Sequence, residues 1–232
     1  MANFRMGGFP GIPLVIKNLI IINVLVWLAE LTFKDEFVSM LSLHYHQSED
    51  FRVWQIFTYM FLHAPNMFLH ILFNMFGLWM FGSTLENLWG PKRFLTFYLI
   101  CGVGAGIIQM LANYIEFTYW DNLFQSGKIS LEMYKIKAGP IYNGIALGAS
   151  GAVMGIFVAY AYLFPNQELF IMPIPVPIKA KYWIIGLILL DLFGGVNPRY
   201  GGGVAHFAHL GGALFGFILV KTMNQNNRRN FY

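Results

Sequence analysis

The chain is short of charge and of cysteine. Asp, Glu, Lys and Arg together make up 11% of its 232 residues, and Cys101 is the single cysteine. One cysteine excludes an internal disulfide, and we expect it to pack as a small apolar group in a helix. With so few charges, a water-soluble fold would have helices that are apolar all round and too little polar surface to cover them. The composition therefore excludes a soluble class.

Basic residues are too few and too scattered for a nucleic-acid surface. The formal net charge is only +4. Lys and Arg near the ends of apolar segments instead indicate membrane topology. If the N-terminus is cytoplasmic, that side holds Arg5, Lys17, Lys92, Arg93, Lys179, Lys181, Lys221, Arg228 and Arg229, and the other side holds Lys34, Arg52, Lys128, Lys135, Lys137 and Arg199. We therefore expect both termini in the cytoplasm, a lipid bilayer around the chain and no nucleic-acid partner.

Most of the chain consists of apolar residues, which form long continuous segments. Hydrophobic residues make up 57% of the chain, and about twenty apolar residues in a row are enough to cross a bilayer. The predicted spans are residues 14–33, 69–88, 94–114, 146–164, 180–194 and 205–223. The fifth is the weakest, because Pro173, Pro175 and Pro177 crowd its start. We predict an all-α, polytopic membrane protein with six transmembrane helices in a single domain over residues 1–232.

The segments between these spans differ in length. No small-residue cleavage site closes the first span, so we expect a retained helix and not a signal peptide. Two connections, residues 34–68 and 115–145, are long, and long loops in compact domains are usually functional. The first contains Trp54, Phe57 and Phe61, which favours a half-buried position in the membrane interface.

Four polar residues lie inside otherwise apolar spans. His70 and Asn74 lie near the start of span two, Ser150 near the start of span four and His209 near the start of span six. Even-numbered spans enter the membrane from the same side, so these residues share one depth, a turn or two below one surface. Polar side chains in hydrocarbon are costly and are functional candidates by default. A hydroxyl, imidazoles and an amide are the groups that acyl-transfer catalysis uses.

Glycine spacing indicates which spans touch. Gly151 and Gly155 follow the serine, and Gly212 and Gly216 follow His209, each pair four residues apart. Such small-residue stripes let membrane helices approach backbone to backbone, which a Ser–His hydrogen bond between spans four and six requires. The alternative is that these glycines only pack.

Other interpretations of the polar residues stay open. Ser150 could be a silent residue at a helix N-terminus, where serine is favoured. His206 competes with His209 for the role of base. We favour His209 because Gly212, three residues later, continues the small-residue stripe that begins at His209. No His-Glu-x-x-His arrangement occurs, so we expect no metal site. Glu30 and Asp191 reach a similar depth, but nothing in the sequence directs either at a histidine.

These residues resemble the motifs of the rhomboid intramembrane serine proteases. Gly148-Ala149-Ser150-Gly151 is similar to the family's Gly-x-Ser-Gly motif, and Ala208, His209, Gly212 and Gly216 are similar to its Ala-His-x-x-Gly-x-x-x-Gly motif. The resemblance implies that Ser150 is the nucleophile and His209 the general base of a Ser–His dyad that needs no cofactor. It also implies that His70 and Asn74, with the Ser150 backbone N–H, bind the oxyanion.

Three further positions bear on the resemblance. Glu86 with Gly90 is similar to the family's acidic turn closing span two. Gln55 stands where the family often has an arginine that stabilises the first loop, and Met154 stands where it often has an aromatic residue packing on the histidine ring. Neither difference removes a reacting group, although the first puts the order of the loop in question.

The resemblance implies an endopeptidase that cleaves peptide bonds in or near the transmembrane helices of membrane proteins. Because a spanning helix has its amides paired already, we expect substrates with helix-destabilising residues. We expect the enzyme in a bacterial cell membrane. The rival interpretations are a rhomboid-like pseudoprotease that only binds helices, and a transporter that uses the polar residues as a pathway. Intact Ser150 and His209 disfavour the first, and the scarcity of intramembrane carboxylates disfavours the second.

Overall fold

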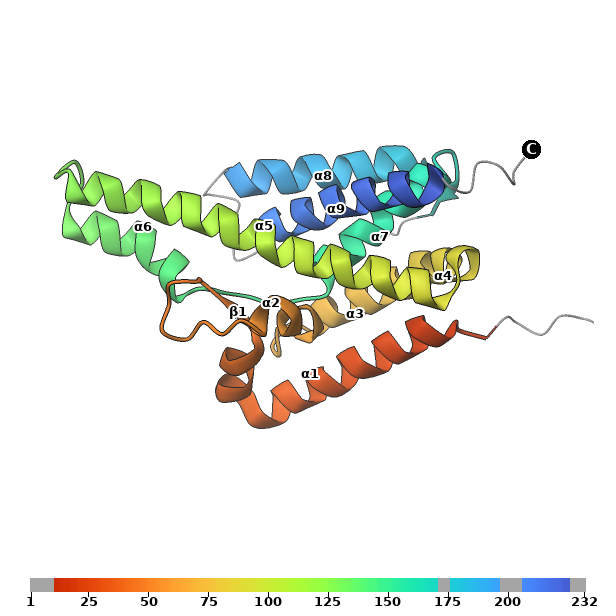
Figure 1. The fold of residues 1–232 in the computed structure, drawn as a ribbon, viewed down its shortest axis with the longest axis horizontal. Helices are drawn as coiled ribbons and strands as arrows, with labels where there is room; N and C mark the ends of the chain where they lie inside the picture. The colour runs from red at the N-terminus through yellow and green to blue at the C-terminus, as the bar shows by residue number, and fades with distance from the viewer. Residues whose placement is uncertain (1–10, 171–175, 197–205, 226–232) are drawn as a thin grey trace, which may run out of the picture.

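The structure is a computed structural model that describes residues 11–170, 176–196 and 206–225, and these residues are mostly helical (Figure 1). The elements in chain order are α1 (Leu14–Leu41), β1 (Leu43–His44), α2 (Gln55–Thr58), the 3₁₀ helix η1 (Tyr59–Phe61), α3 (Phe68–Gly77), the π-helical turn η2 (Leu78–Gly82), α4 (Ser83–Trp89), α5 (Pro91–Gln125), α6 (Leu131–Asn143), β2 (Ile145–Ala146), α7 (Ser150–Leu163), β3 (Glu168–Leu169), β4 (Ile178–Lys179), α8 (Ala180–Val196) and α9 (His206–Gln225). Arg5, Pro173, Pro175, Arg199, Arg228 and Arg229, used above for topology and span limits, lie outside the described residues.

Four of the described helical stretches are long and apolar enough to cross a membrane. They are Leu14–Leu41, Phe68–Trp89, Pro91–Gln125 and His206–Asn224. The helix α7 is apolar but only 14 residues long, and α8 has 17 residues. The structure therefore supports a polytopic helical membrane protein, and the count of six spans stays a prediction.

The predicted connection over residues 115–145 is helical, so the expectation of a long loop there is wrong. The third span continues as α5 to Gln125, and α6 folds back along it (Figure 1). Phe124 stacks on Tyr134 with ring centroids 4.7 Å apart, and the Tyr134 hydroxyl donates to Asp121 at 3.1 Å. At ~1.5 Å per residue, the 35 residues of α5 exceed a hydrocarbon core of ~30 Å. The end of α5 and all of α6 therefore form a hairpin that projects beyond the bundle.

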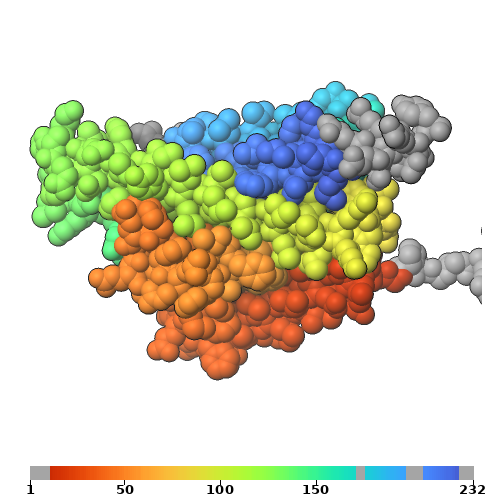
Figure 2. All heavy atoms as spheres, in the orientation of Figure 1, coloured from red at the N-terminus to blue at the C-terminus, as the bar shows by residue number. Residues whose placement is uncertain are grey.

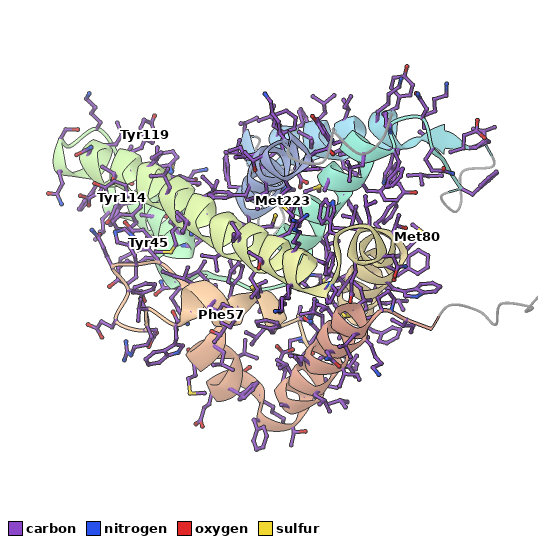
Figure 3. All side chains as sticks on the ribbon, turned by 45° about the vertical axis from the view of Figure 1, so that its right-hand side comes forward. Tyr45, Phe57, Met80, Tyr114, Tyr119 and Met223 are labelled. Atoms are coloured by element: carbon purple, nitrogen blue, oxygen red, sulfur yellow. The ribbon has the colours of Figure 1, made fainter. Side chains whose placement is uncertain are left out.

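The connection over residues 34–68 is also more structured than expected. The helix α1 continues past a kink at Lys34, which has a φ of 54°, as far as Leu41. The strand β1 then pairs antiparallel with β2, and Tyr45 packs on Phe117 of α5 with ring centroids 5.0 Å apart. Figure 2 shows this first loop in orange against the green end of α5, and Figure 3 labels Tyr45 and Tyr114 there.

A buried amide organises this first loop. Gln55 is fully buried, and its Oε1 accepts hydrogen bonds from the backbone N–H groups of His44 and Arg52 at 3.4 and 3.1 Å. Its Nε2 donates to the carbonyls of Asp50 and Met40 at 3.0 and 3.3 Å. Gln55 thus joins several backbone groups of the first loop, whose order the sequence had put in question.

The acidic turn after the second span holds a different helix in place. The carboxylate of Glu86 accepts the backbone N–H groups of Val15 and Ile16, both at 2.9 Å. These are first-turn groups of α1, which have no acceptor within their own helix and carry the positive end of its dipole. Gly90, with a φ of 80°, then turns the chain into Pro91 at the start of α5. Glu86 therefore ties α1 to α4.

Candidate active site

The candidate serine stands at the first residue of α7, after a turn that only glycine makes without strain. Gly148 has a φ of +131°, and its N–H donates to the Tyr59 carbonyl of η1 at 3.0 Å. A Cβ at Gly148 would lie 3.1 Å from His70 Nε2 and 3.5 Å from Ser150 Oγ. The turn therefore leaves a space that is bordered by the serine hydroxyl on one side and by an imidazole of α3 on the other.

Ser150 on α7 and His209 on α9 are 59 residues apart in the sequence and within hydrogen-bond distance. The distance from Ser150 Oγ to His209 Nε2 is 2.7 Å. On its other side, His209 Nδ1 is 2.9 Å from Asp191 Oδ1 of α8. Because the Nδ1 proton is donated to the carboxylate, Nε2 is free to accept the serine O–H. The serine hydroxyl, the imidazole and the carboxylate thus form a continuous hydrogen-bonded chain.

His206 contacts the Asp191 carboxylate and not the serine. Its Nδ1 lies 2.8 Å from the same Asp191 Oδ1. Asp191 is the residue that the sequence did not direct at any histidine, and the structure places it against two. It lies near the end of α8, whereas the histidines lie near the start of α9. The similar depth of these positions was visible in the sequence, but it did not show which face of α8 turns toward α9.

The four glycines predicted to pack lie between α7 and α9. A Cβ at Gly212 would be 1.8 Å from the Gly151 carbonyl oxygen, and one at Gly216 would be 2.6 Å from Gly155 Cα. A Cβ at Gly155 would be 2.6 Å from Cys101 Sγ of α5. The two helices therefore meet backbone to backbone, directly beyond the serine and the histidine.

Two glycines that the sequence reasoning passed over have a similar role on α8. A Cβ at Gly194 would lie 2.5 Å from His206 Nε2, and one at Gly195 would lie 3.3 Å from the Phe207 ring. Their lack of side chains leaves room for the start of α9. The adjacent pair Gly194-Gly195 at the end of the fifth predicted span was the feature of the sequence that could have indicated this contact.

His70 and Asn74 both lie on α3, but their side chains make different contacts. The backbone N–H of Ala64 donates to His70 Nδ1 at 3.4 Å, so the neutral ring carries its proton on Nε2, the atom next to Gly148. Asn74 Nδ2 donates to the His70 carbonyl of its own helix at 2.9 Å. His70 thus presents a donor toward the serine, while one amide hydrogen of Asn74 is already used.

The ring of His63 backs that of His70, with centroids 5.1 Å apart. Burial, and to a smaller extent the neighbouring His70, lowers the pKa of His63 to about 3. At neutral pH His63 therefore adds no positive charge behind the site.

The remaining motif positions add no reacting group. Met154 is buried in the core, one turn after Ser150.

Within residues 11–170, 176–196 and 206–225, no group of three or more His, Cys, Asp or Glu side chains is arranged to hold a metal ion. His206 and His209 instead direct their Nδ1 atoms at one carboxylate oxygen.

Comparison with known proteins decides the family. Residues 50–226, more than half of the chain, match the Rhomboid domain. The chain belongs to the rhomboid family. This confirms the resemblance predicted from the motifs, and with the apolar helices it makes the chain an integral membrane protein.

Individual relatives include proteins from bacteria and mitochondria. Rhomboid protease AarA of Providencia stuartii is 28% identical over 231 residues, which cover 94% of this chain and 74% of the relative. Rhomboid protease GlpG of Haemophilus influenzae is 26% identical, and the match covers 84% of this chain and 83% of the GlpG chain. The human presenilin-associated rhomboid-like protein, mitochondrial, is 31% identical over 65% of this chain, which corresponds to only 33% of that larger protein.

Proposed function

We propose that Ser150 and His209 carry out the peptide-bond hydrolysis by which this chain acts as an intramembrane serine endopeptidase of the rhomboid family. The 2.7 Å distance between Ser150 Oγ and His209 Nε2 is the observation on which this proposal rests. It is the geometry that an activated serine needs. Two bacterial relatives that cover most of this chain are named rhomboid proteases.

The reaction follows from the protonation states of the site. Ser150 Oγ attacks the scissile carbonyl carbon while His209 Nε2 takes the hydroxyl proton. His209 returns this proton to the leaving amine, the peptide C–N bond breaks and an acyl ester on Ser150 remains. A water molecule, deprotonated by His209, then hydrolyses the ester and regenerates the hydroxyl.

The negative charge that develops on the carbonyl oxygen is assigned to three donors. Ser150 is the first residue of α7, and N–H groups of a first helical turn have no acceptor within the helix. His70 Nε2–H borders the same space across Gly148. The second amide hydrogen of Asn74 is the third donor. Donors that are fixed before the reaction stabilise the oxyanion without reorganisation.

The proposed topology has six spans, which adds α7 and α8 to the four long helices. The 14 residues of α7 are only ~21 Å long, less than a hydrocarbon core of ~30 Å. A helix this short begins below the membrane surface, and the extended residues before it let water reach Ser150. The start of α1 and the end of α9 lie at the same end of the bundle (Figure 1), which supports placing both termini in the cytoplasm. A bacterial cell membrane is the proposed location.

The proposed substrates are membrane proteins whose helices unwind easily. Ser150 must reach a peptide carbonyl, but in a regular helix each interior carbonyl is already hydrogen-bonded. Segments with Gly, Ala, Ser or Pro lose less on unwinding. No cofactor takes part in these steps.

Cleavage of a membrane-helix substrate by purified protein tests the proposal. Ser150→Ala and His209→Ala should each lower kcat by at least about a thousandfold and leave the thermal unfolding temperature in detergent unchanged. Ser126→Ala, at the exposed end of α5, is the matched control and should cleave normally. Wild-type turnover by Ser150→Ala would refute the assignment, and an active His209→Ala beside an inactive His206→Ala would identify His206 as the base.

A further inference from the structure

The geometry points to Asp191 as a positioning residue that completes a Ser150–His209–Asp191 triad, with His206 as the second donor that holds its carboxylate. This inference rests on the proposed function and goes beyond the dyad that the resemblance implies. A dyad needs only the serine and the base. Here a third helix, α8, supplies a carboxylate 2.9 Å from the outer nitrogen of the base.

The carboxylate selects one form of the imidazole. A neutral histidine carries its proton on either Nδ1 or Nε2, and only the Nδ1–H form can accept the serine proton. Asp191 Oδ1 accepts a hydrogen bond from Nδ1, which stabilises that form and fixes the plane of the ring. The same negative charge stabilises the imidazolium that forms when His209 takes the proton.

Asp191 is itself held by a second contact. His206 Nδ1 donates to the same Oδ1 atom at 2.8 Å. The His206 ring occupies the space that Gly194 leaves, since a Cβ there would lie 2.5 Å from two ring atoms. Two donors from consecutive turns of α9 therefore restrain one oxygen of α8, and the carboxylate cannot turn away from His209 without breaking both bonds.

The other two buried carboxylates among the described residues, Glu30 and Glu86, accept hydrogen bonds from backbone N–H groups and not from a histidine side chain. Both oxygens of Glu30 lie within 3.1 Å of the His63 backbone nitrogen, so Glu30 holds the segment before α3. Two further titratable side chains lie near the start of α7: His70 of α3, across Gly148 from the serine, and Tyr59, whose hydroxyl would lie 3.7 Å from a Cβ at Gly151 and donates to the Gly102 carbonyl. Within the described residues, Asp191 is the acidic group that hydrogen-bonds to the base.

Asp191→Asn tests the inference because it keeps the shape of the side chain and removes its charge. The amide can donate as well as accept, so the form of His209 with its proton on Nε2 becomes available and cannot activate Ser150. We expect kcat to fall at least about a hundredfold, KM to stay within about threefold and the unfolding temperature to be unchanged. The labelling rate of Ser150 by a fluorophosphonate should fall in parallel.

Two further variants separate a positioning role from a structural one. His206→Phe keeps a ring in the space left by Gly194 but removes the donor, and we expect a smaller decrease in kcat, about threefold to tenfold, again without a change in KM. Asp121→Asn removes a carboxylate on the projecting hairpin and should behave as wild type. If Asp191→Asn fails to fold, the kcat of His206→Phe tests the inference instead. A decrease of about threefold to tenfold at unchanged KM supports it, and an unchanged kcat refutes it.

The result that overturns the inference differs from the one that overturns the proposed function. An Asp191→Asn enzyme with kcat within about threefold of wild type, beside an inactive Ser150→Ala, would leave the dyad standing and refute the triad. Loss of kcat only in proportion to lost thermal stability would also refute it. Cleavage by Ser150→Ala would refute the proposed function itself.

Discussion

The two halves of the bundle are held together by different kinds of contact. Between α7 and α9, glycines bring main chains so close that a Cβ at Gly212 would overlap the Gly151 carbonyl. Around α1, buried carboxylates also accept hydrogen bonds from backbone N–H groups: Glu86 accepts those of Val15 and Ile16, and Glu30 accepts that of His63. Close backbone contact leaves no side chain between the helices that could change rotamer, whereas a carboxylate can still turn about its side-chain bonds.

The difference matches what each half has to do. A Ser–His hydrogen bond fails if the two helices separate by more than about an ångström, so the helices that carry it benefit from a rigid interface. The half around α1 carries neither the proposed nucleophile nor the proposed base. We therefore expect substitutions between α7 and α9 to remove activity, and substitutions around α1 to lower stability first.

Among substitutions that compare the two halves, the largest effect should come from Gly212→Val. Its Cβ would meet the Gly151 carbonyl at 1.8 Å, so α7 and α9 must separate. We expect at least about a hundredfold loss of turnover, together with roughly 1–3 kcal/mol of lost stability. Turnover and unfolding temperature in detergent are the measurements.

Gly186→Val is the matched control for that change. Gly186 lies on α8, and a Cβ there would meet nothing within 4 Å. The same added methyl groups should leave turnover unchanged there. Normal turnover and stability in Gly212→Val would show that the close approach of the two backbones is not required.

An intermediate effect is expected from Glu86→Gln, which tests the half around α1. The neutral amide loses one of two acceptors for the Val15 and Ile16 N–H groups and also the favourable charge at the start of α1. We expect stability to fall by about 1–3 kcal/mol, while kcat of the folded enzyme stays within about twofold. Glu116→Gln, on the exposed surface of α5, is the control. A large loss of kcat at unchanged stability would contradict the division between the two halves.

The sequence predicted part of this organisation and missed the rest for a physical reason. Ser150, His209 and their glycines lie on single helices at fixed spacings, so one-dimensional patterns reveal them. The bond between Asp191 and His209 depends on how α8 and α9 are rotated about their axes, which hydropathy does not determine. The hairpin of α5 and α6 was missed because it is stabilised by contacts such as Phe124 on Tyr134, whose partners are set only by folding.

The smallest effect should come from Gln55→Ala in the first loop. The substitution removes an amide that accepts from the Arg52 N–H and donates to the Asp50 carbonyl, and it leaves those backbone groups without this partner. Each lost hydrogen bond costs about 1 kcal/mol, but the groups that lose Gln55 as a partner lie within residues 39–52. We therefore expect faster proteolysis within this loop, a small decrease in unfolding temperature and turnover within about threefold of wild type. Glu49→Ala, at an exposed position in the same loop, should change none of these measurements. Unchanged proteolysis in Gln55→Ala would mean that the packing of Tyr45 on Phe117 holds the loop without the amide, whereas loss of most turnover would show that the first loop belongs with the rigid half of the bundle.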